Sequence, residues 1–275
     1  MLPIASKVWT PFAPHVPGVP VREISTPIVA WDSMLHQELK MPKSNQFEAY
    51  ETNAAAYDDN NDARQRTMRK KARAVATALS LDFTGSIIEV GCGTGLFTEH
   101  MAQILPGATI TATDAFPAML EQARPRLQRF KNVRLQLYDA EKDLESAERF
   151  DAVIGCDIIH HIDEPVRAMM AWRTVVGPGG RMVFIETNGI NPVLFLRSYG
   201  KAEEARLILS TRQNLSRWPA EAGWHTIDVD HVPIHLPNGP RAAWSALDRL
   251  DELLHKVPPI RLIAGALLLR ARATA

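Results

Sequence analysis

Short apolar runs alternate with amphipathic stretches through the middle of the chain. Three of these stretches have helical spacing of apolar residues: Leu96 to Ile104, Met119 to Phe130 and Pro165 to Val175. Five runs between and around them predict strands, at Ile87 to Val90, Ile110 to Thr113, Val133 to Leu137, Ala152 to Cys156 and Met182 to Ile185. Strands that are apolar on both faces are typical of a parallel sheet covered by helices on both sides. The pattern therefore predicts an α/β fold with a doubly wound sheet.

The last third of the chain predicts further elements of both kinds. Strands are expected at Trp224 to Val232 and Ile260 to Ala271, which makes seven in a mostly parallel sheet. A helical segment, Asn45 to Leu81, comes before the first strand. The remaining elements are helices at Asn191 to Leu209 and Leu247 to Lys256, and a turn at Gly177 to Gly180.

Proline sets the amino-terminal segment apart. Seven of the first 43 residues are proline, a density that blocks regular helix and indicates an extended arm. We therefore expect two parts: a proline-rich arm at residues 1–43 and one domain at residues 44–275. Apolar residues such as Trp9, Phe12 and Trp31 indicate that part of the arm packs on something. A flap over the ligand site and a homodimer contact are the two roles that remain open.

Composition narrows the classes of partner. The 31 basic residues balance 31 acidic ones, so no net charge attracts nucleic acid or an anionic membrane surface. The two cysteines, Cys92 and Cys156, lie in apparent core motifs, which favours reduced thiols. The longest strongly apolar run, Leu262 to Leu269, is far shorter than the ~20 residues that cross a bilayer. We expect a cytoplasmic protein.

A glycine loop follows the first predicted strand. Gly91, Gly93 and Gly95 allow a sharp turn and the close approach of a ligand, with a helix beginning just beyond. The dinucleotide motif places its third glycine three residues after the second, whereas Gly95 comes only two after Gly93. Glu89 would repel a diphosphate but attract an ammonium group. The loop therefore favours S-adenosylmethionine, and a nicotinamide oxidoreductase is the weaker alternative.

At these residues the sequence resembles the class I S-adenosylmethionine-dependent methyltransferases of the small-molecule type. The family's first motif is an acid, one residue and then Gly-x-Gly-x-Gly, which stands here as Glu89-Val90-Gly91-Cys92-Gly93-Thr94-Gly95. The resemblance covers about residues 45 to 271 and implies the Rossmann-like methyltransferase fold. It also implies that Glu89, Cys92 and the three glycines bind the cofactor.

Two carboxylates farther along strengthen the cofactor assignment. Asp114 and Asp139 each follow a predicted strand, at the edge of the sheet where ligands sit in such folds. Asp114 can accept hydrogen bonds from both ribose hydroxyls. By resemblance to the family, Asp139, with Ala140 beside it, would contact the adenine. The same resemblance assigns Gly155 and Cys156 to the methionine moiety.

Two histidines after the fourth strand are the candidate catalytic residues. Methyl transfer needs mainly orientation, but a hydroxyl, amine or carbon acceptor benefits from a base, and histidine titrates in the useful range. His160 and His161 lie beside the expected methyl group, although either could instead brace the next helix. With Asp157 they occupy the positions that resemble the metal-binding group Glu-x-x-Glu-His of ubiquinone-pathway O-methyltransferases. Both glutamates of that group are missing here, so we expect no metal.

A second group of histidines invites a metal interpretation and does not support it. His225, His231 and His235 would share one face of a regular strand. Pro233 interrupts the ladder, and apolar residues share that face, so packed or solvent-edge histidines are the better interpretation.

The acceptor is expected to be a small, partly apolar molecule, in secondary metabolism for example. Base-methylating enzymes usually place two prolines and an aromatic residue where this chain has Ile158-Ile159-His160, so nucleic acid is disfavoured. Tyr50, Tyr57, Glu186 and Asn188 are the candidate acceptor contacts. The leading alternative is a protein that binds S-adenosylmethionine without transferring methyl, as an assembly subunit or a catalyst of another rearrangement.

Overall fold

The computed structural model describes residues 62–143, 148–192, 194, 202–234, 241–263 and 265–274. The predicted arm at residues 1–43, its boundary with the domain, and the candidate residues Tyr50 and Tyr57 lie outside this part of the chain.

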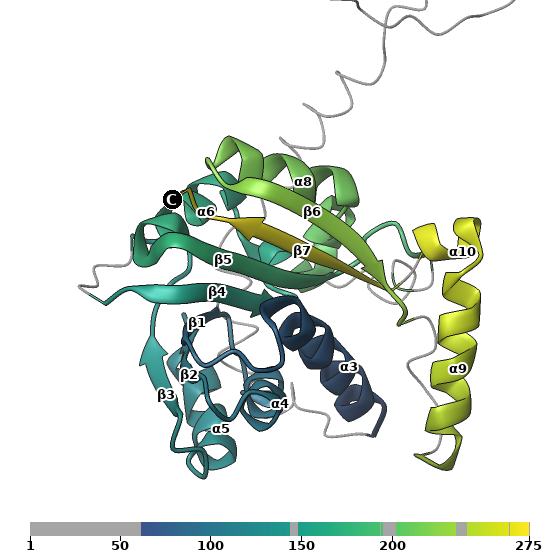
Figure 1. The fold of residues 1–275 in the computed structure, drawn as a ribbon, viewed down its shortest axis with the longest axis horizontal. Helices are drawn as coiled ribbons and strands as arrows, with labels where there is room; N and C mark the ends of the chain where they lie inside the picture. The colour runs from purple at the N-terminus through teal and green to yellow at the C-terminus, as the bar shows by residue number, and fades with distance from the viewer. Residues whose placement is uncertain are drawn as a thin grey trace, which may run out of the picture. The chain divides into compact units, whose positions relative to one another are not determined.

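The described residues form one seven-stranded sheet with the order β3-β2-β1-β4-β5-β7-β6 (Figure 1). The strands from β1 to β5 pair in parallel, and β7 pairs antiparallel with both β5 and β6. This confirms the doubly wound, mostly parallel sheet that the apolar runs predict. The strands are β1 Ser86–Val90, β2 Thr109–Asp114, β3 Val133–Leu137, β4 Phe150–Cys156, β5 Val176–Thr187, β6 His225–Val232 and β7 Ala266–Arg272.

Helices cover both faces of the sheet, as Figure 1 shows. On one face lie α3 Asp62–Leu79, α4 Leu96–Ile104 and α5 Pro117–Leu127. On the other lie α6 Pro165–Val175 and α8 Arg212–Glu221. Successive strand residues feed the two cores alternately: Ile87 belongs to the first core and Ile88 to the second. Both cores are apolar, so the sheet is buried on both faces, which places a ligand site at its edge.

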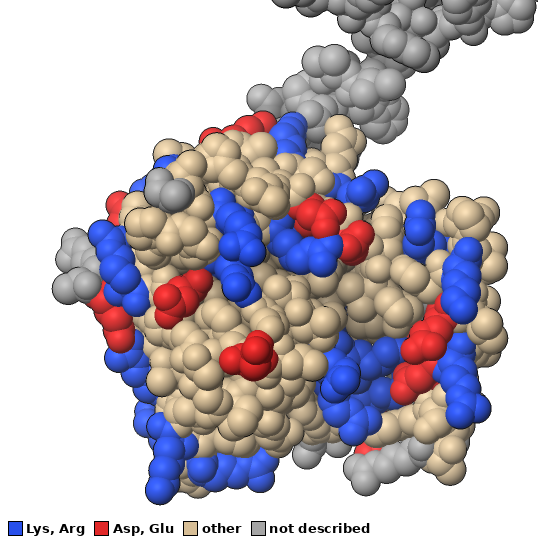
Figure 2. Space-filling view, viewed as in Figure 1, with Lys and Arg blue, Asp and Glu red and all other residues tan. Residues whose placement is uncertain are grey.

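The helix α9 Trp244–His255 is attached to α3 mainly by charge. Asp251 is fully buried and accepts a hydrogen bond of 2.6 Å from Lys70 Nζ, and Arg66 pairs with Asp248. Figure 2 shows the basic and acidic side chains facing each other over α3 and α9. The remaining short elements are η1 Ile159–His161, η2 Ala202–Leu209, η3 Arg241–Ala243 and α10 Pro258–Leu262.

Three sequence predictions need correction. Residues 177–180 do not form a turn before β5 but bulge within it, because Phe150 pairs with Val176 while Ala152 pairs with Arg181. The predicted strand at 260–271 begins only at Ala266, because two prolines start the short helix α10 before it. The described end of the predicted helix at 191–209 is the 3-10 helix η2.

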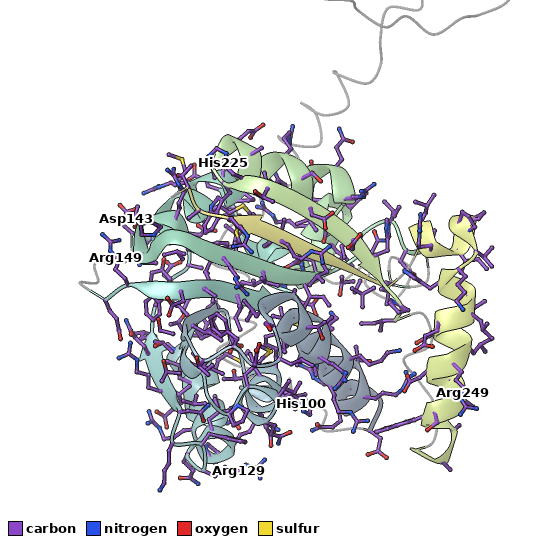
Figure 3. The ribbon with its side chains drawn as sticks, viewed as in Figure 1. His100, Arg129, Asp143, Arg149, His225 and Arg249 are labelled. Atoms are coloured by element: carbon purple, nitrogen blue, oxygen red, sulfur yellow. The ribbon has the colours of Figure 1, made fainter. Side chains whose placement is uncertain are left out.

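The histidines of β6 do not line up on one face of the strand. His225 is exposed at the start of β6, where Figure 3 labels it, and His231 is half-buried. A register shift between His225 and Asp228, with a positive φ of 51° at Thr226, breaks the regular alternation that would align the two histidines. His235 lies outside the described residues. No helix in the described ranges has the length and apolar character that a membrane span requires.

Candidate functional site

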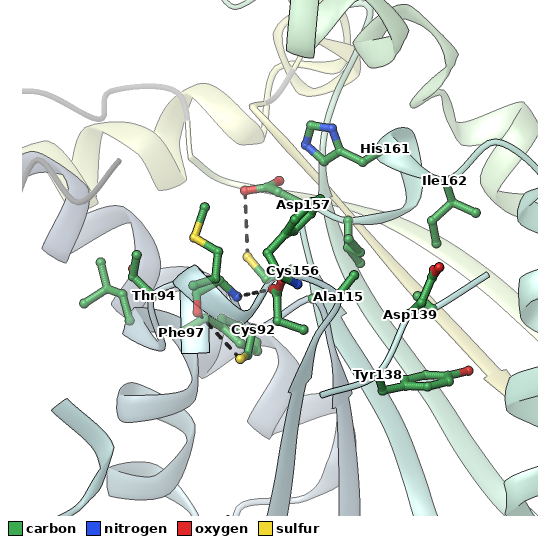
Figure 4. Close-up of a pocket in the computed structure, with 18 of the residues that line it drawn as sticks. Cys92, Thr94, Phe97, Ala115, Tyr138, Asp139, Cys156, Asp157, His161 and Ile162 are labelled. Atoms are coloured by element: carbon green, nitrogen blue, oxygen red, sulfur yellow. Dashed lines mark hydrogen bonds between the residues drawn. The ribbon is translucent and has the colours of Figure 1, made fainter. Parts of the chain in front are cut away.

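A cavity opens at the carboxyl ends of β1 to β4, with about 1250 Å³ of empty space including its open mouth (Figure 4). Its walls come from α3, the glycine loop, the ends of β2 and β3, and the loop after β4. Figure 4 shows Cys92 and Phe97 on one side of the cavity and His161 on the opposite side, above Asp157.

The three glycines of the loop have left-handed backbone conformations for different reasons. A Cβ on Gly95 would lie 2.8 Å from the Leu127 side chain, so this glycine permits close helix packing. A Cβ on Gly91 would lie 2.5 Å from Ile158. Gly93, with φ of 53°, would have its Cβ in open space within the cavity wall. Of the three loop glycines, only Gly93 leaves open space in front of its backbone, which a ligand could occupy.

Asp114 ties the glycine loop to the end of β2. The Gly93 amide donates to Asp114 Oδ2 at 2.8 Å, and the Phe116 amide donates to Oδ1 at 3.0 Å. Burial raises the pKa of this carboxyl above its usual value, because it is only 6% exposed. Each carboxylate oxygen has capacity for a second hydrogen bond, and Asp114 lines the cavity. The carboxylate can therefore receive two hydroxyl groups side by side, as a ribose presents them.

Glu89 lies behind the loop and does not line the cavity. It is 1% exposed, and its Oε2 has no hydrogen-bond partner among the described residues. Burial raises its pKa to about 8. A buried carboxylate with one oxygen unsatisfied, beside an open glycine loop, fits a group with an ammonium. So does the wider cavity, whose wall carries five acidic side chains and one arginine. These residues fit S-adenosylmethionine.

The opposite end of the cavity follows β3. Tyr138, Asp139 and Ala140 line it, and the Glu141 amide donates to Asp139 Oδ1 at 3.1 Å. The Tyr138 hydroxyl donates to Lys142 O at 2.9 Å, which fixes the ring at the cavity edge. A flat apolar surface beside a carboxylate is suited to a purine with an exocyclic amine.

Asp157 begins the loop after β4 in a strained conformation, with φ of 52°. Its Oδ1 accepts 2.8 Å hydrogen bonds from both the amide and the hydroxyl of Thr187, and its Oδ2 pairs with Lys71 Nζ. Burial alone would raise the pKa of this carboxyl, but the Lys71 ammonium overrides it and lowers the value to about 2. Asp157 therefore places an ionised carboxylate in the cavity wall.

Glu186 organises the next three residues. Its Oε1 accepts from the amides of Ile158 and Ile159 at 2.8 and 2.9 Å, and its Oε2 lies 2.7 Å from His160 Nδ1. Glu186 is fully buried and His160 only 3% exposed. The two candidate histidines therefore point in different directions, although their ring centroids are only 4.1 Å apart. His160 turns into the core, and His161 lines the cavity.

The cavity thus gathers part of the predicted site. Glu186 and Asn188, the predicted acceptor contacts, do not line the cavity, and Asn188 donates to Leu262 O at 3.1 Å. A Cβ on Gly155 would meet Phe184 at 2.5 Å, so that glycine serves packing. The predicted residues that line the cavity are Gly91, Cys92, Gly93, Asp114, Asp139, Ala140, Cys156 and His161. Those that do not are Glu89, Gly95, Gly155, His160, Glu186 and Asn188.

Sequence reasoning missed the contribution of α3. Arg64 and Met68 line the cavity, and Lys71 contacts Asp157 just behind the wall. Their spacing of four and three residues puts them on one face of a helix, which is the signal that could have found them. It gave no hint of the partner, because Asp157 lies 86 residues away in the chain.

Two of the side chains considered as metal ligands from the sequence bind other protein groups. Asp157 binds Lys71 and Thr187, whereas His160 turns to Glu186, so these two side chains do not converge with His161 on one point. Within the described ranges, no three acidic, histidine or cysteine side chains are grouped to hold a metal ion. The residues therefore do not fit a metal of the kind considered from the sequence.

Comparisons with known proteins agree with this geometry. A family model described as a methyltransferase domain matches residues 88–182. A ubiquinone biosynthesis O-methyltransferase of Xanthomonas axonopodis pv. citri (strain 306) is 30% identical over 186 residues, which are 63% of this chain and 76% of that protein. The enzyme with the same description from Coxiella burnetii (strain RSA 331) is 25% identical over 161 residues, 54% of this chain and 67% of that protein.

A solved structure shares the fold. It is a protein of Thermotoga maritima described as an S-adenosylmethionine-dependent methyltransferase and possible histamine N-methyltransferase. The match has a TM-score of 0.62 and 16% identity, and covers 83% of this chain and 99% of that one.

The chain belongs to the class I S-adenosylmethionine-dependent methyltransferases. It is an enzyme that transfers the methyl group of this cofactor, and the resemblance carried by the glycine loop is confirmed.

Proposed function

We propose that the enzyme methylates a hydroxyl group of a small, partly apolar acceptor, with His161 as the general base. The observation that carries the proposal is that His161 lines the cavity wall opposite the glycine loop, while His160 is buried against Glu186. The relatives named as O-methyltransferases support oxygen as the methylated atom.

The cofactor would lie along the first three strand ends. Asp114 would receive the ribose hydroxyls, Asp139 and Ala140 the adenine, and the open backbone at Gly93 would pass close to the nucleoside. Glu89, behind the loop and with a pKa raised to about 8 by burial, would ionise as the ammonium of the methionine moiety binds in front of it. When bound, this cofactor supplies a methyl group already activated by its sulfonium for in-line displacement.

His161 and Asp157 would have different duties. The pKa of Asp157 is lowered to about 2 by Lys71, so its carboxylate is a poor proton acceptor near neutral pH. A neutral histidine ring accepts a proton readily in that range. His161 would therefore take the hydroxyl proton, while Asp157 contributes a fixed negative charge at the wall.

The cavity wall suits a partly apolar acceptor. Met68, Ile158 and Ile162 line it and would exclude water from the transfer step. Arg64 at the same wall provides a cation for a polar substituent. The cytoplasmic location, the homodimer and a role in secondary metabolism stay predictions from the sequence.

The test uses matched acceptors that differ in one atom. The protein is incubated with labelled S-adenosylmethionine and with catechol or 2-aminophenol, and mass spectrometry identifies the methylated atom and S-adenosylhomocysteine. We expect O-methylated products. Methylation of the amine alone would overturn the hydroxyl assignment, and tight cofactor binding without turnover across a panel of hydroxyl acceptors would favour a binding role without transfer.

The base is tested by His161→Gln. Loss of a general base lowers kcat by about 100-fold or more, and cofactor affinity should stay within about twofold. His225→Gln is the matched control, because His225 is exposed at the opposite edge of the sheet (Figure 3). Unchanged kcat in His161→Gln would remove His161 from the mechanism.

A further inference from the structure

We propose that Lys71 on α3 is a positioning residue for methyl transfer, whose buried ammonium holds the loop after β4 in the conformation that presents His161 to the cavity. The inference rests on the proposed role of His161. It adds a residue that neither touches the cavity nor belongs to the glycine loop.

Lys71 is a costly residue in its position. Its side chain is 4% exposed, forms an ion pair with Asp157 Oδ2 and donates to Thr187 Oγ1 at 3.3 Å. Removing an ammonium from water costs more than its pairing usually returns, and an apolar side chain of similar volume is often as stable or more so. Stability therefore gives little reason for a lysine here, whereas control of the Asp157 carboxylate does.

Asp157 is where control of the loop is needed. A left-handed φ of 52° at a residue other than glycine is strained and persists only when neighbours hold it. The amide and hydroxyl of Thr187 bind Oδ1, and Lys71 binds Oδ2, so this carboxylate joins α3, β5 and the end of β4. The direction in which the chain leaves β4 depends on this junction.

The rest of the loop is tied from other elements. Glu186 of β5 binds the amides of Ile158 and Ile159. Arg206 of η2 donates to Ile162 O at 2.6 Å and pairs with Asp163 at 2.5 Å. His161 lies between the residues held by Glu186 and those held by Arg206, and Lys71 adds a third contact from α3, behind the cavity wall. The helix that carries Lys71 also contributes Arg64 and Met68 to the wall, so one rigid element sets both the wall and the loop.

A direct catalytic role for Lys71 fits the geometry less well. Lys71 does not line the cavity, and pairing with Asp157 raises the pKa of its ammonium despite the opposing effect of burial. The group therefore stays protonated and engaged. Its effect on the reaction would pass through Asp157 and the backbone that follows.

The experiment compares three variants of the full chain: Lys71→Met, Lys71→Arg and, as a matched control, Lys70→Met. Lys70 is the preceding residue on α3, but it pairs with Asp248 and Asp251 on α9 and does not line the cavity. For each variant, kcat and KM for the acceptor, the cofactor dissociation constant and the thermal midpoint are measured.

We expect Lys71→Met to lower kcat by about 10- to 100-fold, as misplacement of a reacting group by about 1 Å does. Cofactor affinity and KM should change by less than about threefold, because Asp114 and the glycine loop are untouched. Lys71→Arg should recover most of kcat, and Lys70→Met should keep it. A Lys71→Met enzyme with unchanged kcat, or one whose kcat falls only in proportion to its loss of folded protein, would overturn the proposal.

A double-variant cycle tests the route through Asp157. If Lys71 acts through this carboxylate, Lys71→Met combined with Asp157→Asn should be no slower than the slower single variant. Effects that multiply would overturn the positioning role. The two proposals fail separately: unchanged kcat in His161→Gln refutes the base, whereas unchanged kcat in Lys71→Met with an impaired His161→Gln refutes only the positioning residue.

Discussion

The glycine loop after β1 and the loop after β4 face each other across one cavity but are held in different ways. Backbone groups and one carboxylate from the neighbouring strand hold the first: Cys92 N–H donates to Thr113 O at 2.8 Å and Gly93 N–H to Asp114. Side chains from three separate elements, Lys71, Glu186 and Arg206, hold the second.

The difference separates what is general from what is particular to this chain. Backbone geometry at a strand end tolerates many sequences, so the cofactor side can be shared across a large family. Side-chain ties need specific partners far apart in the chain, so the acceptor side can vary with the substrate. The predictions below test whether the two loops separate in this way.

The largest expected effect is on cofactor binding in Asp114→Ala. If Asp114 receives the ribose as proposed, the change removes two charge-assisted hydrogen bonds, each of about 2 kcal/mol, and the dissociation constant should rise about 1000-fold. Calorimetry with S-adenosylmethionine measures it. A change of less than about tenfold would mean that Asp114 serves only the Gly93 and Phe116 amides.

Glu89 should make the stability of the cofactor-free protein depend on pH. Its pKa is raised from 4.5 to about 8, so the folded state holds the proton more tightly than the unfolded state does. This stabilisation is complete below pH 4.5 and is lost as pH rises through 8. We measure the free energy of unfolding in urea at pH 5 and at pH 8. Its decrease between the two pH values should be about 3 kcal/mol smaller in Glu89→Gln than in the parent protein. Parallel pH curves would contradict the raised pKa of the buried Glu89 carboxyl.

Glu186→Gln should act on the second loop alone. An amide in place of the carboxylate keeps the shape but turns an NH₂ group toward other donors, which costs about 2 kcal/mol in unfolding free energy. Glu164→Gln is the control, since its surface pair with Arg167 is largely exposed and should change stability by less than about 0.5 kcal/mol. Cofactor affinity near the parental value in Glu186→Gln would support independent loops, and a large loss would break the comparison.

The smallest effect separates two glycines of the first loop. Alanine in either left-handed position costs about 1 kcal/mol of backbone strain. Gly95→Ala adds overlap with Leu127 and should lose more stability, as a lower thermal midpoint. Gly93→Ala places its Cβ in open space and should instead weaken cofactor binding more. The reverse ranking would mean that Gly93 does not face the cofactor.

The sheet and the cofactor side were predictable because their signals are local. Apolar runs place the strands, Asp114 is the last residue of β2, and Asp139 comes two residues after the end of β3. Boundaries failed where other parts of the fold decided them. The glycines at 177–180 became a bulge because β4 pairs on both sides of them, and α10 displaced the start of β7.

The acceptor side was less predictable. Glu186 reads as a pocket residue in the sequence, yet in the fold it binds three groups of the loop after β4, 26 to 28 residues earlier in the chain. Arg206 gave no sequence signal at all, because its partners Ile162 and Asp163 lie more than 40 residues away.

The sequence by itself determined the fold class, the glycine loop and the two carboxylates at the carboxyl ends of β2 and β3, because each depends on a strand and the few residues around its end. The tertiary structure decided which of two adjacent histidines faces the cavity. Neighbours in a 3-10 turn point about 120° apart, and Glu186 fixes which way the turn is rotated by binding His160. It also placed Lys71 on Asp157, since a pair 86 residues apart forms only when α3 packs beside β4 and β5.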